Sequence, residues 1–387
     1  MKCRTNLLLA AFLGLFASVA PTQFAVAADN VTLTKGKETV KIAVGDDVFG
    51  VYQFSGRHKK PYLIAVSAPD GKEILNSYVH GPRDESFPEA GRVFVVAEAA
   101  TLTGSGEKVQ FGDILDVDKI GDEGLYIASK KGWLKRSDAV PLGVMVTRVI
   151  EDPPSSKSYD HVHHKGVWNT VDEVNGVKFW KEDGRIENQS VELVTPSGNP
   201  AVMKVVNQWL GPDGNAILNE QTTISIYANR LYVYDITFSP AGDEAVFEDT
   251  KEGMFAIRMP ESMTEKKGMG PVVNAEGMQG TKSCWGRTSP WVDYIGPIGA
   301  NKFGLTIMDH PENPRKSRYH VRDYGLFSIN PFGTKSYTAG TDAPQPADVL
   351  TLKKGETFRA RYALYVRHVD SKNVDINTVY EDFVKAD

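Results

Sequence analysis

Three histidines stand within four positions of this chain, at His161, His163 and His164, between Asp160 and Trp168. If this stretch is a strand, His161 and His163 share one face and His164 points to the other. Imidazoles exchange protons near neutral pH, so the pair could act on a polar substrate. With a third ligand from a distant segment, the pair could instead bind a metal. A hydrogen-bonded structural cluster is the third interpretation, and the residue types alone leave all three open.

A second polar stretch occupies residues 319–325, where alternation along a strand places His320, Arg322 and Tyr324 on one face. An imidazole, a guanidinium and a phenol together offer proton transfer, a charged fork and an aromatic wall. Polyols such as sugars need this mixture of directional donors and flat apolar surface. The alternative is a surface ion-pair network between Arg322 and Asp323.

Aromatic and acidic side chains provide further candidates. Trp285, Trp291 and Asp293 stand in the short stretch 285–294 and suit a carbohydrate-binding surface, although core packing would explain the aromatic residues equally well. Glu252 and Asp172 are the best remaining carboxylates for acid–base chemistry, although solvated surface positions would suit both.

These observations predict one polar site assembled from distant segments. The residues predicted to transfer protons or stabilise charge are His161, His163, His164, His320, Arg322, Glu252 and Asp293. The residues predicted to bind the substrate are Trp168, Trp180, Trp285, Trp291, Tyr324 and Asn330. Weaker candidates are His310, Lys178 and Glu220, and Cys284 lacks the surroundings of a nucleophile. No metal ligands are assigned, and the cofactor is unknown.

Motifs of several other enzyme classes are missing from the sequence. The chain has no Gly-x-Ser-x-Gly elbow, no Gly-rich phosphate loop ending in Lys-Ser or Lys-Thr, and no His-Glu-x-x-His.

The elements that must position these residues read as short strands bounded by Gly, Pro, Asn and Asp. Strands are predicted over residues 31–34, 191–194, 222–227, 231–238, 305–308 and 358–366. A short closing helix is predicted after the N-cap residue Asp375, because Ile376, Val379, Tyr380 and Phe383 follow at helical spacing. Many short strands and few helices predict a large antiparallel β-sandwich.

The segment 92–142 reads as several short strands with a small core of its own. Its Gly112-Asp113 before an apolar strand and its later Gly132-Trp133-Leu134 resemble bacterial SH3-like domains. We therefore predict a small SH3-like barrel at 92–142, inserted into a large β domain formed by 28–91 and 143–387.

Composition and the N-terminus limit the class of protein. The chain has 387 residues, 41% hydrophobic and 24% charged, with a net charge of -5, which argues against disorder, coiled coil and general nucleic-acid binding. Lys2 and Arg4, the apolar stretch 7–20 and Ala25-Val26-Ala27 predict a signal peptide over 1–27. No later apolar stretch is long enough for a membrane span. We expect a periplasmic or secreted protein of net charge 42 − 49 = -7, with only Cys284 remaining and therefore no internal disulfide.

Taken together, several stretches resemble the DUF6807 family, also labelled the methane oxygenase PmoA family. They are Lys60-Pro61-Tyr62, 160–168, Asn175 to Trp180, Asp249 to Gly253, Ser289 to Gly296 and His320 to Gly333. The label implies membrane-embedded methane oxidation, but this sequence lacks the spans that such chemistry would require. The resemblance also implies a fold similar to the galactose mutarotase-type β-sandwich and a role in carbohydrate metabolism.

The leading hypothesis is therefore an exported enzyme that acts on a sugar or glycoside. One histidine would donate a proton to a ring or glycosidic oxygen, Glu252 or Asp293 would act as base, and Arg322 would hold a hydroxyl or developing charge. The alternatives are a non-catalytic glycan-binding protein, whose SH3-like segment could hold a cell-wall partner, and a metal-dependent enzyme built on the histidines at 161–164.

Overall fold

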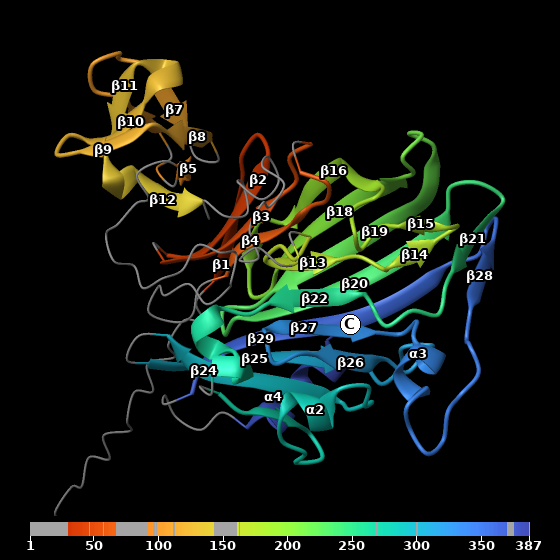
Figure 1. Cartoon of the computed structure of the whole chain (residues 1–387). Helices are drawn as coiled ribbons and strands as arrows, with labels where there is room; N and C mark the ends of the chain where they lie inside the picture. The colour runs from red at the N-terminus through yellow and green to blue at the C-terminus, as the bar shows by residue number, and fades with distance from the viewer. Residues whose placement is uncertain are drawn as a thin grey trace, which may run out of the picture.

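The computed structural model describes residues 30–45, 47–56, 58–66, 91–95, 97, 99–110, 113–142, 161, 163–267, 270–298, 301–369 and 375–386. In these ranges the regular structure consists mainly of antiparallel strands, and two large sheets pack face to face (Figure 1). The predicted all-β sandwich is confirmed.

One large sheet, which we call sheet A, has the strand order β17-β1-β2-β3-β4-β13-β22-β27-β26. In chain order its strands are β1 (Val31–Lys35), β2 (Thr39–Val44), β3 (Asp47–Gln53), β4 (Tyr62–Val66), β13 (Val167–Asn169), β17 (Ser197–Gly198), β22 (Phe255–Arg258), β26 (Arg318–Val321) and β27 (Leu326–Asn330).

The other, sheet B, has the order β16-β18-β19-β20-β29-β25-β24-β23. Its strands are β16 (Arg185–Thr195), β18 (Ala201–Leu210), β19 (Ala216–Ile226), β20 (Leu231–Pro240), β23 (Val272–Asn274), β24 (Trp291–Ile298), β25 (Asn301–Asp309) and β29 (Phe358–His368). The strands expected from apolar alternation fall within or overlap these elements, because alternate side chains of each strand enter the core.

The main hydrophobic core lies between the two sheets. Phe255 of β22 packs against Tyr234 of β20, with ring centroids 4.8 Å apart, and both side chains are buried. The same core includes Ile257 of β22 and Ile236 of β20. The next residues along β22, Ala256 and Arg258, point away from this core because successive strand residues face opposite sides.

The outer face of sheet B is covered by α4 (Ile376–Lys385), whose Val379 and Phe383 pack on it. The Asp375 side chain accepts a hydrogen bond from the Asn377 N–H at 3.0 Å. The predicted closing helix and its N-cap are therefore confirmed.

The strands in the segment 91–142 form small sheets around a separate core and are drawn apart from the large sheets in Figure 1. They are β5 (Gly91–Val95), β6 (Ala99–Thr101), β7 (Lys108–Gln110), β8 (Ile114–Val117), β9 (Lys119–Gly121), β10 (Gly124–Ile127), β11 (Gly132–Leu134) and β12 (Ala139–Leu142), with 3₁₀ helices η1 (Ala128–Lys130) and η2 (Arg136–Asp138). The SH3-like assignment and the domain boundaries stay predictions.

The remaining elements border sheets A and B. A further sheet has the order β15-β14-β21-β28. Its strands are β14 (Glu173–Val174), β15 (Val177–Lys178), β21 (Glu244–Phe247) and β28 (Leu350–Lys353), and the short helices are η3 (Glu261–Met263), η4 (Glu265–Lys267), α2 (Thr281–Cys284) and α3 (Thr334–Thr338). Among the helices of the described residues, none has the length and apolar character of a membrane span.

Candidate functional site

A single row of residues crosses the outer face of sheet A. Strand register pairs Trp168 with Ala256, Ala256 with Ser328, and Ser328 with His320. Facing residues of neighbouring strands project to the same side. The row therefore has an aromatic ring at each end, Trp168 on β13 and His320 on β26, with the small side chains of Ala256 and Ser328 between them. All four side chains lie on the same face of the sheet.

The two histidine-bearing stretches meet on this face. The ring of His161 stacks on Tyr324, with centroids 5.1 Å apart and an interplanar angle of 7°. Its other stacking partner is His164, at 4.7 Å and 10°. Tyr324 belongs to the same outer-face packing group as Trp168 and Trp180. Residues more than 150 positions apart thus contribute to one cluster.

The histidine stretch is not a regular strand, so the predicted arrangement of its side chains is wrong. His161 has a φ of 56° and its carbonyl accepts the N–H of His164 at 2.9 Å, which forms a tight turn before β13 begins at Val167. As a result, His164 packs on His161 and His163 instead of pointing to the opposite side. Asp160 and Val162 lie outside the described residues.

Glycine is required directly after this turn. Gly166 has a φ of 57°, and a Cβ placed there would lie 1.9 Å from the Leu63 carbonyl oxygen of β4. The close approach lets the chain turn into β13 beside β4. This turn places the ring of His164 against the ring of Trp168, with centroids 5.3 Å apart.

Arg258 determines which nitrogen of His164 carries the proton. Arg258 Nη1 lies 3.1 Å from His164 Nδ1, and a guanidinium can only donate. His164 Nδ1 therefore accepts, and the neutral ring carries its hydrogen on Nε2. That Nε2 atom is buried and has no hydrogen-bond partner among the described residues.

At the other end of the row, His320 is held by groups on both of its nitrogens. Arg322 Nε donates to His320 Nε2 at 3.0 Å, as strand alternation predicts for residues two apart. His320 Nδ1 lies 3.1 Å from the Lys251 carbonyl oxygen and 3.3 Å from Glu252 Oε2. His320 is therefore a neutral Nδ1–H ring that links Glu252 to Arg322.

Two buried lysines and a largely buried glutamate lie beside the histidine stretch. Glu182 Oε1 accepts from Lys165 Nζ at 2.6 Å and from Lys60 Nζ at 3.1 Å. Lys60 Nζ also donates to the His163 carbonyl at 2.8 Å and lies 5.3 Å from the centre of the Trp168 ring. Burial, opposed by Glu182, lowers the pKa of Lys60 to about 8, whereas the two ammonium groups outweigh burial and lower the pKa of Glu182 to about 2.

Burial keeps His163, His164 and His320 neutral. Desolvation, with a further contribution from Lys60, lowers the pKa of His163 to about 3. Burial also lowers the pKa of His164 far below its ordinary value, and it lowers that of His320 despite the neighbouring Glu252. At neutral pH these rings supply hydrogen bonds instead of positive charge.

The pKa values of two carboxyl groups, Glu252 and Asp172, are shifted in opposite directions. Burial opposes ionisation of Glu252, but His320 and Lys251 outweigh it and lower its pKa to about 2. Burial raises the pKa of Asp172, which Glu252 raises further and a hydrogen bond from Thr250 opposes. Carboxyl groups whose pKa values are pushed apart are candidates for the base and the acid of one reaction.

We call the residues that converge here the outer-face cluster. They are Lys60, His161, His163, His164, Lys165, Trp168, Asp172, Trp180, Glu182, Lys251, Glu252, Arg258, Trp285, His320, Arg322, Tyr324 and Ser328. His161, His163, Glu252, Trp285, Arg322 and Tyr324 are partly exposed. Trp168 and Trp180, predicted as substrate-binding surfaces, are each only 1% exposed and form the inner wall.

Two predicted site residues lie elsewhere. Trp291 and Asp293 are on β24, two positions apart, on the outer face of sheet B beside α4. The indole N–H of Trp291 donates to Asn377 Oδ1 of α4 at 3.0 Å, and Asp293 forms a two-point ion pair with Arg367 at 3.0 and 2.6 Å. The sandwich core separates both from the outer-face cluster, so neither shares its chemistry.

Among the remaining candidates, His310 lies away from the cluster, whereas Asn330, predicted to bind the substrate, is buried beside Glu252. His310 packs on Phe383 of α4 and borders a cavity of about 290 Å³. Asn330 donates to the carbonyl oxygens of Thr250 and Glu252, so it shapes the backbone next to Glu252. Lys178 is exposed, and the buried Cys284 has a pKa raised by burial to about 11, which makes it a poor nucleophile.

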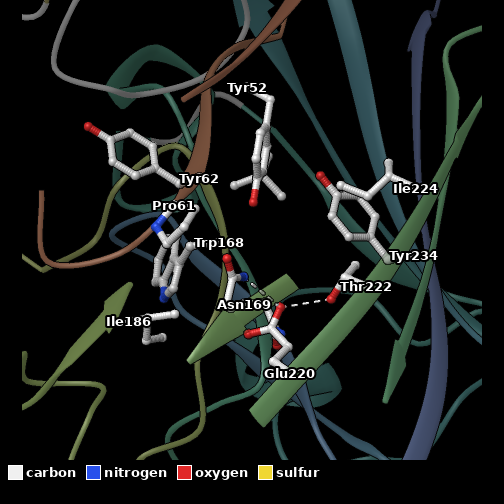
Figure 2. Close-up of a pocket in the computed structure, with 12 residues that line it drawn as sticks. Tyr52, Pro61, Tyr62, Trp168, Asn169, Ile186, Glu220, Thr222, Ile224 and Tyr234 are labelled. Carbon is white, nitrogen blue, oxygen red and sulfur yellow. Dashed lines mark hydrogen bonds between the residues drawn. The ribbon is translucent and has the colours of Figure 1, made fainter. Parts of the chain in front are cut away.

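Glu220 lies inside the sandwich, where Asn207, Trp209 and Thr222 donate to its carboxyl group. Figure 2 shows it beside a small cavity between the sheets, together with Asn169, the residue after Trp168. The cavity of about 20 Å³ has room for about one water molecule. Burial raises the pKa of Glu220. It is a structural polar group on the far side of β13.

Sequence reasoning missed Glu182 and Arg258, and it included Lys60, Lys165 and Ser328 only as members of matching stretches, without a role. Single Lys, Glu, Arg and Ser residues occur throughout the chain, and nothing local distinguishes the buried ones. The nearest signal was Lys165, which directly follows the three histidines. Register and packing alone show that these residues join the cluster.

Metal ligation finds no support in the arrangement of these rings. Imidazole lone pairs lie in the ring plane, and His161 and His164 stack face to face. In the described part of the chain, no group of three or more His, Cys, Asp or Glu residues is arranged to hold a metal ion.

The fold and the cluster define an all-β sandwich protein with a neutral-histidine, arginine and carboxylate cluster on the outer face of one sheet. The chain belongs to the family described as "Family of unknown function (DUF6807)", which matches residues 140–381. The match begins close to the end of the segment 92–142. No curated protein matches the chain.

Solved structures with similar folds include carbohydrate-active proteins. Galactose 1-epimerase from Lactobacillus acidophilus is 10% identical with a TM-score of 0.33, and the match covers 88% of this chain and 98% of that one. An aldose epimerase homologue from C. elegans is 9% identical with a TM-score of 0.25, covering 89% and 100%. A beta-arabinopyranosidase is 15% identical with a TM-score of 0.24, and the match covers 52% of this chain but only 32% of that one.

Proposed function

We propose that the protein is an exported enzyme that performs acid–base chemistry on a sugar or glycoside at the outer-face cluster. The observation that carries this proposal is the convergence of 161–168 and 320–324 beside the carboxyl groups of Glu252 and Asp172. Directional donors, aromatic walls and a differentiated carboxyl pair together match the needs of proton transfer on a polyol.

The roles differ from those expected from sequence. Glu252, ionised over the physiological range, serves as the base, and Asp172, whose pKa is raised, serves as the proton donor. His320 has a hydrogen-bonding partner on each ring nitrogen, so it holds Arg322 and Glu252 in place. The partly exposed His163 provides a neutral hydrogen bond to the ligand, and the buried His164 packs behind it.

Turnover by two variants of the full chain tests these roles. A panel of glycosides and reducing sugars would be followed by mass spectrometry and by NMR of the anomeric proton. Glu252→Gln and Asp172→Asn should each reduce turnover by about 10²-fold or more, and His163→Ala and His320→Ala should also reduce it. Unchanged turnover in all four variants would refute the enzyme proposal.

Non-catalytic glycan binding is the second candidate, and partly exposed Trp285 and Tyr324 support it. Both rings already have partners, since Arg322 lies 5.6 Å from the centre of the Trp285 ring and His161 stacks on Tyr324. Glycan binding without any product would favour this candidate.

We further propose export through residues 1–27 and an SH3-like role for 92–142 in holding a cell-wall partner, supported by the sequence patterns and by the separate core of that segment.

A further inference from the structure

Donors outnumber acceptors among the unpartnered buried atoms of the outer-face cluster. In the described residues these atoms include three donors, His164 Nε2, Trp168 Nε1 and Trp285 Nε1, together with the hydroxyl of Ser328 and one acceptor, Asp172 Oδ1. An indole N–H can only donate, and Arg258 forces His164 Nε2 to donate as well. Unpaired buried donors cost free energy, so the natural complement of this face is a group rich in acceptor oxygens.

Positive charge is also in excess on the histidine side of the cluster. Lys60 and Lys165 are 1% and 0% exposed, and they share the single carboxylate of Glu182. Two ammonium groups facing one carboxylate leave one positive charge in a buried place. The contacts of Lys60 with Glu182, the His163 carbonyl and Trp168 occupy this ammonium group, so it acts on a ligand through its field.

At the His320 end of the row, Arg322 can contact a ligand directly. No ion pair joins its guanidinium to a carboxylate within the described ranges, and it makes none with Asp323. Its Nε donates to His320, which orients the planar group and leaves the terminal nitrogens available as a fork. Ser328 stands opposite His320 in the strand register and adds a hydroxyl. Glu252, at the same end, pairs with Lys251.

We propose that the ligand of the outer-face cluster is a sugar carrying an anionic group, a carboxylate or a sulfate, which the Arg322 fork binds. The inference rests on the proposed function, because it names the class of sugar for the same site. His163 lies on the Lys60 side of the cluster, where its carbonyl accepts from Lys60 Nζ and its partly exposed ring packs on His161 and His164. The neutral part of the sugar faces His163, and the anion faces Arg322.

Binding of the full chain to an array of neutral and acidic oligosaccharides provides the first test. Calorimetry with methyl glucuronide, methyl glucoside and glucose 6-sulfate then compares matched anionic and neutral sugars. Binding should be about tenfold tighter for at least one anionic sugar and should weaken with added salt, whereas binding of the neutral sugar should not. The two anionic probes distinguish carboxylate from sulfate.

Variants connect this preference to Arg322. Arg322→Gln should remove the preference, and Arg322→Lys, which keeps the charge but loses the fork, should restore only part of it. Arg136→Gln, an exposed arginine on η2, is the matched control and should bind like the unmodified chain. The salt dependence is measured on the unmodified chain and does not depend on the folding of a variant.

The outcomes separate the two proposals. Equal affinity for neutral and anionic sugars, or binding of neutral glycans alone, refutes the anionic ligand and leaves the sugar site standing. Absence of binding to every glycan on the array refutes both. A retained preference in a folded Arg322→Gln variant refutes the assignment of the anion to Arg322.

Discussion

Arg258 Nη1 lies 3.1 Å from His164 Nδ1, so a residue at the end of β22 determines the tautomer of a histidine 94 positions earlier. The guanidinium cannot accept a hydrogen bond, and the buried imidazole cannot easily take up a proton. His164 is therefore an Nε2–H donor. The Arg322–His320 pair produces the opposite tautomer, with the hydrogen on Nδ1.

These tautomers can be observed directly. Long-range nitrogen–proton NMR correlation at neutral pH should show His164 neutral with its hydrogen on Nε2 and His320 neutral with its hydrogen on Nδ1. Arg258→Met should abolish the single tautomer of His164 and leave His320 unchanged. A doubly protonated His164 ring at neutral pH would contradict the assignment.

Acid should destabilise the fold as the pH falls below about 6.5. The folded pKa of His163 is lowered, chiefly by burial and then by Lys60, to about 3, whereas the unfolded chain binds a proton near the ordinary value. Its contribution is therefore fully present above the unfolded pKa and is lost as the pH falls toward the folded pKa.

For His163 alone, this linkage amounts to about 2 kcal/mol between about pH 8 and about pH 5. Urea unfolding of the unmodified chain and of His163→Gln over this interval measures it. The variant should show a flatter dependence of the unfolding free energy on pH. Identical slopes would mean that His163 is solvated in the folded protein.

The buried Lys60–Glu182–Lys165 group should contribute strongly to stability. Glu182→Gln leaves two buried ammonium groups without their carboxylate and should lower the free energy of unfolding by about 3 kcal/mol. Because the pKa of Glu182 is lowered to about 2, this stabilisation is present above the unfolded pKa of about 4.5 and is lost as the pH falls toward about 2.

A second glutamate provides the control for this prediction. Glu187 pairs with Arg185 on the surface and is 41% exposed, so Glu187→Gln should change the free energy of unfolding by less than about 0.5 kcal/mol. Denaturant titration of both variants at neutral pH makes the comparison. Equal costs would show that the buried group is not formed.

Asp293 should be important for stability and not for catalysis. It is 0% exposed, and Asp293→Asn would leave Arg367 without its carboxylate, at a cost of about 3 kcal/mol. Turnover per folded molecule should remain unchanged, whereas Glu252→Gln should lose it. Loss of turnover in a fully folded Asp293→Asn variant would show that Asp293 takes part in catalysis and would contradict this prediction.

Much of the fold could be predicted because strand alternation is local. The expected strand over 358–366 is the first part of β29 (Phe358–His368), and the expected helix after Asp375 is α4. The site was predicted less completely. His320 and Arg322 were correctly placed on one face, because β26 is regular up to Val321. The histidine stretch was misread, because its turn at His161 breaks the alternation on which the prediction depended.

Two carboxylates show that residue type alone does not identify the catalytic base. Asp293 and Glu252 were equal candidates for the base, but Asp293 pairs with Arg367 on the outer face of sheet B and Glu252 lies beside His320. Which face of which sheet a carboxylate occupies depends on the pairing of distant strands, and no short segment contains that information.

By itself, the sequence determined the all-β class, the closing helix, the positions of several long strands and the types of residue available for chemistry, since each depends on periodicity or composition within a few neighbouring residues. The tertiary structure decided which of them act together. Pairing of β13, β22, β27 and β26 aligned Trp168, Ala256, Ser328 and His320 in one row. Burial on that face keeps His163, His164 and His320 neutral, and Arg258 and Arg322 fix the tautomers of His164 and His320. The pKa values of Glu252 and Asp172 are shifted in opposite directions, because desolvation and neighbouring charge depend on three-dimensional surroundings.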